Sequence, residues 1–293
     1  ETGITLDINE GEFVSLTGAS GSGKSTLMNI LGCLDRPTSG HYYIAGEDVA
    51  KFNAAERATL RNKRIGFVFQ NFNLLSRTTA LENVMMPAVY AHPALSMKAM
   101  RERSVELLNL VGLSDRMDHT PAQLSGGQQQ RTALARILVG RPKILMLDEP
   151  FSALDSYLRE EVEGEVGSLL AGFGGTALLV THNRDEAYRL CRDMIVMDGG
   201  QVLRTGGTKE VFADPQSTTA ARLTGCKNIL SCTRVDAHTV RLTGWDAPLH
   251  LAAEVPETCT AVGIRAHDFA PCAPAAPNAL PVQLNSTSEN PFD

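Results

Sequence analysis

Short apolar runs recur between residues 13 and 197 and alternate with stretches of helical periodicity. Each run is about four residues long and is apolar on both faces, as in strands of a buried parallel sheet. Residues 97–113 instead carry apolar side chains at helical spacing, which predicts a helical insertion. The alternation predicts an α/β domain on a largely parallel sheet, with strands at Phe13–Leu16, Gly66–Phe69, Ile144–Leu147, Ala177–Val180 and Met194–Met197.

The last quarter of the chain has a different pattern. Seven of the 14 prolines fall in residues 221–293, and short alternating runs at Thr239–Leu242 and Val262–Arg265 lie between turn residues. This pattern predicts a small β-rich domain over 221–293, after a larger domain over 1–220. Because the chain stops within such a pattern, we expect the second domain to be incomplete.

Composition narrows the range of functions. Lys and Arg number 27 against 33 Asp and Glu, a formal net charge of −6, which argues against binding nucleic acid through bulk charge. No apolar run approaches the roughly 20 residues that cross a bilayer. We therefore expect any membrane role to come through a partner. The six cysteines form no CxxC pair and have no zinc-ligand spacing, so they are expected to be reduced thiols.

A glycine-rich loop follows the first predicted strand. Residues 18–25 read GASGSGKS, which matches GxxxxGK[ST] at every fixed position. A helix with apolar Leu27, Ile30 and Leu31 follows, and this context favours a phosphate-binding loop over an ordinary Gly/Ser-rich turn. Glycines let backbone N–H groups surround phosphate oxygens, a lysine reaches the β- and γ-phosphates, and the Ser25 hydroxyl can bind Mg²⁺. The candidate phosphate-binding residues are Gly18, Ser20, Gly21, Ser22, Gly23, Lys24, Ser25 and Thr26.

Two carboxylates end the strand at Ile144–Leu147. Asp148 is the candidate second Mg²⁺ contact, and Glu149 is the candidate group that orients or deprotonates an attacking water. A surface role for Glu149 is the alternative, and the complete phosphate-binding loop upstream makes that alternative the weaker one.

A second helix start lies about a hundred residues after the first. Ser125 is a good N-cap for a helix over residues 128–139, and two glycines beside it expose backbone N–H groups. One nucleotide has one γ-phosphate, so a second anion-seeking helix start needs its own explanation. Its candidate ligand-binding residues are Ser125, Gly126, Gly127 and Gln128.

The segment Leu124–Gln128 resembles the signature motif of the ATP-binding cassette (ABC) ATPases. Gln70 matches their glutamine loop, Ser152–Asp155 matches the loop after the second carboxylate strand, and His182 matches the switch histidine. The resemblance covers about residues 12–185. It implies a P-loop NTPase fold with a helical subdomain at about 72–135, ATP and Mg²⁺ as cofactors, and ATP hydrolysis.

The same resemblance implies roles and partners. His182 would contact the γ-phosphate, and Gln70 would join Ser25 and Asp148 at the metal and link it to a transmembrane permease. The family also implies a head-to-tail homodimer, in which Ser125–Gln128 of one chain closes the phosphate-binding loop of the other. The expected location is peripheral, on the cytoplasmic face of the inner membrane.

The substrate is harder to assign because two parts of the chain differ. Residues 13–91 resemble macrolide-export and lipoprotein-release cassettes, whereas the chain from about Leu124 onward, including Phe151–Arg159, resembles molybdate-importer ATPases. We favour molybdate-type oxyanion import, because that resemblance is longer and includes an accessory domain. The alternatives are an exporter ATPase of the macrolide or lipoprotein-release type and, more remotely, a soluble ABC protein acting on DNA or ribosomes.

Overall fold

The computed structural model describes residues 3–90, 96–152, 154, 156–245, 248–273 and 275–279. The chain divides into two compact units, Glu1–Pro215 and Gln216–Asp293. The division falls at residue 215, against 220 in the sequence-based prediction. Each unit is described separately below.

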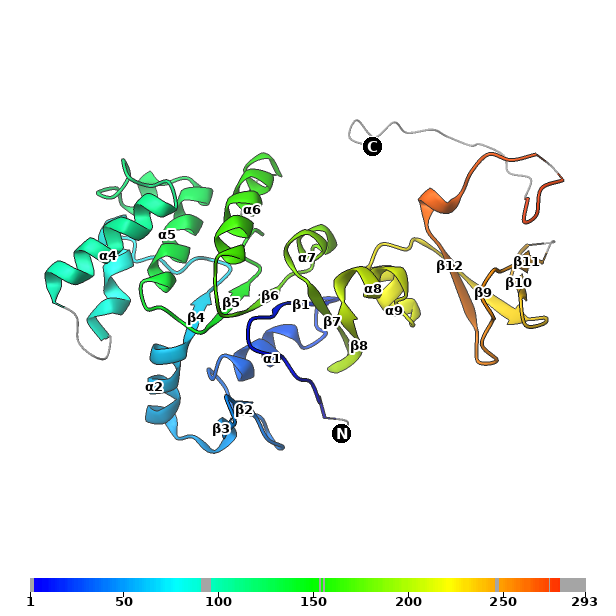
Figure 1. Ribbon diagram of the computed structural model, residues 1–293, viewed down its shortest axis with the longest axis horizontal. Helices are drawn as coiled ribbons and strands as arrows, with labels where there is room; N and C mark the ends of the chain where they lie inside the picture. The colour runs from blue at the N-terminus through cyan, green and yellow to red at the C-terminus, as the bar shows by residue number, and fades with distance from the viewer. Residues whose placement is uncertain are drawn as a thin grey trace. The chain divides into compact units, whose positions relative to one another are not determined.

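A six-stranded sheet forms the centre of the first unit (Figure 1). Its strand order is β4-β5-β6-β1-β7-β8, and every neighbouring pair is parallel except the last, β7 with β8. All five predicted strands are present within two residues of their expected ends. The strands are β1 (Phe13–Gly18), β4 (Ile65–Val68), β5 (Ile144–Asp148), β6 (Thr176–Val180), β7 (Asp193–Asp198) and β8 (Gln201–Gly207).

Both faces of this sheet are covered, which explains why its strands are apolar throughout. On β5, Leu145 and Leu147 join one core cluster, while Met146 between them joins the other. The first cluster is completed by α5 (Gly126–Leu138) and α6 (Ser156–Ala171), and the second by α1 (Lys24–Leu31). In Figure 1, α5 and α6 lie on one side of the sheet and α1 on the other.

Smaller elements complete this unit. A hairpin of β2 and β3 follows α1, and η1 and α2 lead from the hairpin into β4. Along the chain, one further helix precedes β7 and another follows β8. The bounds are β2 (Tyr43–Ile44), β3 (Glu47–Asp48), η1 (Val49–Lys51), α2 (Ala54–Arg64), α7 (Arg184–Leu190) and α8 (Thr208–Ala213).

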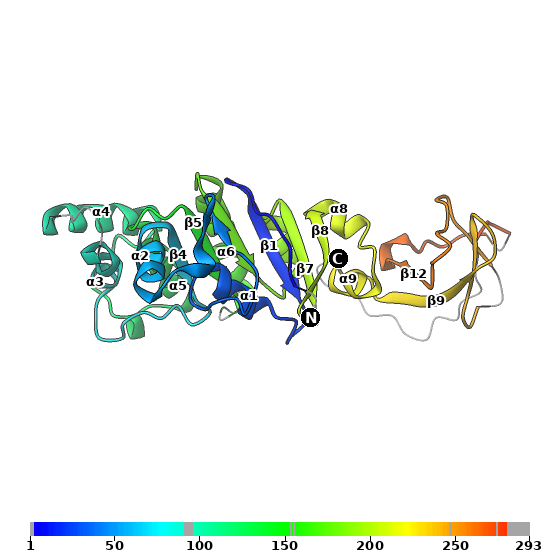
Figure 2. The same ribbon diagram turned by 90° about the horizontal axis from the view of Figure 1, so that it is seen from below.

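A helical subdomain interrupts the sheet between β4 and β5, as predicted. It lies beyond β4, at the end of the unit opposite β8 (Figures 1 and 2). The helix expected over 97–113 is α4, which ends at Leu110, and the helix expected from residue 128 begins at Gly126 because Ser125 caps it. Besides α5, the elements are α3 (Ala80–Met85), η2 (Met86–Tyr90), α4 (Met97–Leu110) and η3 (Pro121–Gln123).

The second unit is β-rich. After one short helix it forms a four-stranded antiparallel sheet in the order β11-β10-β9-β12. Cys232, Val240, Leu242, Leu249 and Val255 form its buried core. The elements are α9 (Thr218–Leu223), β9 (Asn228–Arg234), β10 (Thr239–Leu242), β11 (Leu249–His250), β12 (Ala261–Ile264) and η4 (Ala266–Asp268).

Among the described residues, no helix has both the length and the apolar character to cross a bilayer.

Candidate functional site

The loop between β1 and α1 has the backbone that its glycines predict. Gly21 and Gly23 have φ of +77° and +95°, in the left-handed region that only glycine adopts without strain. A Cβ on Gly18 would lie 2.4 Å from the carbonyl oxygen of Met197, so this position also requires glycine. Gly23 is the N-cap of α1 and gives it no side-chain cap, which leaves the first N–H groups of the helix available to an anion.

Lys24 is held inside this loop. Its side chain is buried, and its Nζ donates to the carbonyl oxygens of Gly18 and Ala19 at 2.8 Å each. Burial lowers the pKa of Lys24, while Glu149 and Asp148 act in the opposite direction. Ser20, Ser25 and Thr26 are exposed beside it. A cationic amine, uncapped N–H groups and exposed hydroxyls form a donor set that fits a triphosphate.

The two carboxylates lie at the carboxyl end of β5. Asp148 is its last residue, and burial, with Glu149 next to it, raises the pKa of this carboxyl, while Lys24 lowers it. Glu149 has a φ of +43°, which is costly for a residue with a side chain. Its N–H donates to the Val180 carbonyl at 2.9 Å, and the Ser152 hydroxyl donates to its carbonyl at 2.8 Å. These bonds hold the strained backbone in place.

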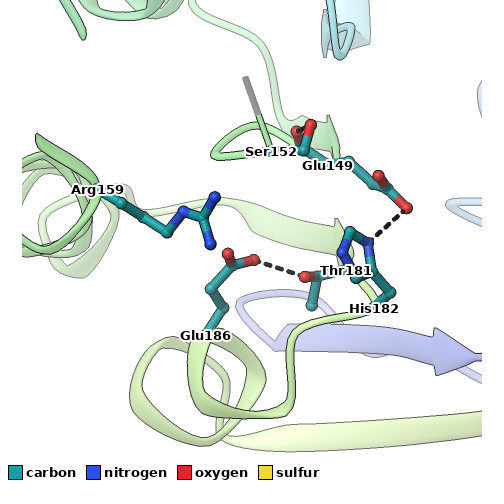
Figure 3. Close-up of a pocket in the computed structure, with 6 residues that line it drawn as sticks. All are labelled: Glu149, Ser152, Arg159, Thr181, His182 and Glu186. Atoms are coloured by element: carbon teal, nitrogen blue, oxygen red, sulfur yellow. Dashed lines mark hydrogen bonds and ion pairs between the residues drawn. The ribbon is translucent and has the colours of Figure 1, made fainter. Parts of the chain in front are cut away.

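Three of the predicted residues meet at the Glu149 carboxylate. Nδ1 of His182 lies 3.0 Å from Oε1, and Nε2 of Gln70 donates to Oε2 at 3.5 Å. Gln70 follows β4, Glu149 follows β5 and His182 follows β6, so three adjacent strands deliver these side chains to one edge of the sheet. Figure 3 shows His182 and Glu149 facing each other.

A small polar pocket lies beside this contact (Figure 3). Its volume is about 50 Å³, enough for one or a few water molecules. Six polar residues line it: Glu149, Ser152, Arg159, Thr181, His182 and Glu186.

Sequence reasoning missed Glu186. Its carboxylate is buried and accepts hydrogen bonds from the Thr181 hydroxyl at 2.5 Å and the Asn183 amide at 3.1 Å. These two donors flank His182, so Glu186 fixes the turn that carries it. The acid in the first turn of α7, after the Asn183 cap, was visible in the sequence, but its bond to Thr181 was not.

Arg136 was missed as well. Its guanidinium, on α5, donates to the carbonyl oxygens of Phe72 and Asn73 at 2.7 and 2.6 Å. Both of these residues have positive φ, at +57° and +46°, and they follow Gln70 closely in the chain. Burial lowers the pKa of Arg136. One side chain thus joins the helix that begins with the Ser125 motif to the strained segment after Gln70.

The second helix start is already capped. The Ser125 hydroxyl accepts from the Gln128 N–H at 3.3 Å, and the Gln128 side chain accepts from the Ser125 N–H at 3.0 Å. Within the described part of the chain, no hydrogen bond or ion pair joins Ser125–Gln128 to the loop at 18–25. Ser152 and Leu154 of the predicted loop 152–155 are described, whereas Ala153 and Asp155 lie outside the described residues.

Comparison with known proteins identifies the family. The sequence model of the ABC transporter family matches residues 2–152. The chain belongs to this family. The cassette is 50% identical to a macrolide export ATP-binding/permease protein, MacB, of Brucella melitensis over 216 residues, 74% of this chain and 33% of that protein. It is 48% identical to the uncharacterized ABC transporter ATP-binding protein YknY of Bacillus subtilis over 208 residues, 71% of this chain and 89% of that protein.

Solved structures agree with the fold. The cassette MJ0796, determined as a dimer in a post-hydrolysis state with ADP and Pi, matches with a TM-score of 0.63 and 42% identity, over 69% of this chain and 88% of that one. The predicted P-loop ABC ATPase fold and the assignment as an ATP-hydrolysing cassette are therefore confirmed.

The relatives bear on the substrate as well. The cassette spans about a third of the length of the MacB proteins it matches. Names of macrolide and pyoverdine exporters among these relatives support the exporter alternative better than the molybdate-import interpretation that the sequence analysis favoured.

Proposed function

We propose that this cassette is the ATP-hydrolysing subunit of an export-type ABC transporter, with Glu149 as the general base. The observation that carries the proposal is the position of the Glu149 carboxylate between Gln70 and His182, at the ends of three adjacent strands. The polar pocket beside it has room for water, which is the nucleophile in hydrolysis.

The residues at the N-terminal end of α1 would hold the triphosphate. N–H groups of the uncapped helix and the loop, with the Lys24 ammonium, would neutralise its charge. Ser25, Gln70 and Asp148 supply hydroxyl, amide and carboxylate oxygens, the donor types that Mg²⁺ prefers. A bound Mg²⁺ would stabilise charge that develops on the phosphate oxygens.

Glu149 would accept the proton of the attacking water. Its carboxylate is mostly shielded, with 23% of the side chain exposed, and its backbone is held at an unusual φ. Rigid placement is what a general base needs, since it must reach the proton in one geometry. His182 on one carboxylate oxygen and Gln70 on the other would orient it. We assign to His182 a contact with the γ-phosphate.

A second copy of the cassette would complete each site. Ser125, Gly126, Gly127 and Gln128 of one protomer would meet the triphosphate held by the other. Two observations support this arrangement: the similar cassette MJ0796 forms a dimer, and among the described residues no hydrogen bond or ion pair joins Ser125–Gln128 to the phosphate-binding loop of the same chain. A transmembrane permease would be the further partner, and this chain would bind it at the cytoplasmic face of the inner membrane.

Export is supported by the macrolide and pyoverdine exporters among the relatives. Molybdate-type import remains the second candidate, because the cassette is followed by a β-rich unit with its own core. The two are distinguished by pairing the cassette with an exporter permease and with a molybdate-type permease in liposomes. Stimulation of hydrolysis by the exporter permease supports the proposal, and stimulation by the molybdate-type permease alone contradicts it.

The role of Glu149 is tested with Glu149→Gln. The amide keeps the size of the side chain but cannot take the proton, so we expect phosphate release to fall at least ~100-fold with ATP binding retained. Glu47→Gln, at an exposed hairpin position, is the matched control and should leave both unchanged. Full turnover in Glu149→Gln would rule out its role as the base.

A further inference from the structure

Two thiols meet in the core of the second unit. Sγ of Cys232, on β9, lies 3.6 Å from Sγ of Cys259, just before β12. All six cysteines of the chain are free in the structure, and this is the one thiol–thiol contact that its described residues contain.

The backbone around the pair is well fixed. The Cys232 N–H donates to the Thr260 carbonyl at 2.9 Å, and the Cys259 N–H donates to the Pro256 carbonyl at 3.0 Å. Strands β9 and β12 pair in register from Ser231 with Ala261 onward. The sulfur atoms must approach from 3.6 Å to the ~2.05 Å of a disulfide, a movement that side-chain rotation can supply.

We propose that Cys232 and Cys259 form a thiol–disulfide modification site, whose co-reactant is a low-molecular-weight disulfide. The two protein thiols are oxidised to one disulfide, and the small disulfide is reduced to two thiols, which take up the two protons. This proposal concerns the second unit and does not depend on the roles assigned in the nucleotide site.

Exposure sets the order of the two steps. Cys259 is partly exposed, whereas Cys232 is buried, with 8% of its surface accessible. The Cys259 thiolate therefore attacks the small disulfide first, forms a mixed disulfide and releases one thiolate. The Cys232 thiolate then attacks the Cys259 sulfur and displaces the second thiolate.

Burial makes the second step slow at neutral pH. Burial, together with the neighbouring Cys259, raises the pKa of Cys232 to about 11, so little thiolate is present near pH 7. The pair is therefore slow to oxidise at neutral pH. Once formed, the disulfide closes the segment of 27 positions that contains β10 and β11, which restricts the unfolded chain.

The chain carries a natural reporter of this event. Trp245, its single tryptophan, packs against the core cluster that contains Cys232, and Cys259 packs against the same cluster. Tryptophan emission therefore follows this unit alone. We expect oxidation to change the emission and to raise the thermal midpoint recorded with it by about 10 °C.

The experiment uses the full chain with Cys272→Ser, which removes the one fully exposed thiol. One sample is kept reduced, and a second is incubated with oxidised glutathione at about pH 8.5. Both samples are then unfolded and alkylated, and their masses are measured by mass spectrometry. Five alkyl groups are expected on the reduced protein and three on the oxidised one, since the six cysteines become five after substitution and two then pair. Peptide mapping should join residue 232 to 259.

Single substitutions make the test specific. Cys232→Ser should trap one glutathione on Cys259, Cys259→Ser should prevent the reaction, and Cys226→Ser, at a buried neighbouring thiol, should leave it unchanged. If Cys232→Ser unfolds, the Trp245 emission shows it, and the test of specificity then rests on the loss of the reaction in Cys259→Ser, at the partly exposed position. Five alkyl groups after oxidation, a persistent mixed disulfide with Cys232 present, or pairing with Cys226 would each overturn the proposal.

Discussion

Helices α1 and α5 both begin beside glycines, but their N-termini are in different states. Gly23 gives α1 no side-chain cap, whereas Ser125 and Gln128 close a capping box on α5. The first helix also has a buried ammonium, Lys24, at its first position, and neither helix has an acidic group in its first turn. We propose that the open end binds a highly charged anion alone and that the capped end adds to an anion already held elsewhere.

Nucleotide affinity would then rest on α1 and site closure on α5. An uncapped helix end leaves its first N–H groups without partners in the protein, so a ligand can take the place of water there. A capped end is stable without ligand. The comparison predicts different consequences for changes at each end.

The largest effect is expected at the open end. Lys24→Ala removes the ammonium that would neutralise the phosphates, and ATP affinity should fall at least ~100-fold, about 3 kcal/mol. Titration calorimetry measures it, and Lys63→Ala, at an exposed position on α2, is the control. An affinity close to that of the natural chain would show that α1 is not the principal phosphate site.

A third helix start extends the comparison. On α7, Asn183 caps the helix and Glu186 binds Thr181 and Asn183, on either side of His182. Glu186→Gln weakens these bonds while keeping the shape, so kcat should fall about tenfold with an unchanged KM for ATP. Asp185→Asn, an exposed acid of the same turn, is the control. A changed KM with normal kcat would contradict a role in positioning His182.

Removing the cap of α5 should have a smaller effect, on stability. Ser125→Ala leaves the Gln128 N–H without its acceptor, which costs about 1 kcal/mol of unfolding free energy. Urea unfolding measures this loss, and Ser125→Asn, which can still cap, should retain most of the stability. The ATP affinity of the monomer should stay unchanged. A loss of affinity as large as in Lys24→Ala would abolish the distinction between the two helix ends.

The smallest effect concerns Asp148, next to the open end. Burial is the main cause of the raised pKa of Asp148 in the folded state. As the pH rises from below 3.8 through this higher pKa, the carboxylate becomes charged and lowers the free energy of unfolding. Asp148→Asn should therefore raise the thermal midpoint by about 2 °C at neutral pH and leave it unchanged in acid, below 3.8. Asp118→Asn, at an exposed position, is the control. A lower thermal midpoint of Asp148→Asn at neutral pH would contradict the prediction that the charge of Asp148 destabilises the folded chain.

Much of the fold was predictable because its signals are local. Two motifs are each contained within a few residues: the apolar run at Ile144–Leu147 with the two acids after it, and the glycine loop with Lys24. The same holds for Ser125 and Gln128, although the sequence did not reveal that they satisfy each other rather than stay open. Helix α5 consequently starts two residues earlier than expected.

Contacts between distant segments were not predictable. Arg136 meets Phe72 and Asn73 across more than sixty positions, and both partners have a strained backbone that no local pattern marks. The Glu149 contact with Gln70 likewise spans 79 positions. Gln70 and His182 were found through resemblance to the family, and Glu186, without such a mark, was missed.

The central claim is that the open end of α1 and the capped end of α5 complete one site from two chains. It is tested most directly by mixing two inactive variants, Lys24→Ala and Gly126→Asp. The second places a carboxylate in the first turn of α5, where helices tolerate it but a phosphate is repelled.

In a mixed dimer, the intact α1 of the Gly126→Asp chain meets the intact α5 of the Lys24→Ala chain. An equal mixture should therefore regain about a quarter of the natural rate of phosphate release, because half of the dimers are mixed and each has one complete site of two. A mixture as inactive as its components would contradict the account, since it would mean that both helix ends serve the nucleotide of their own chain.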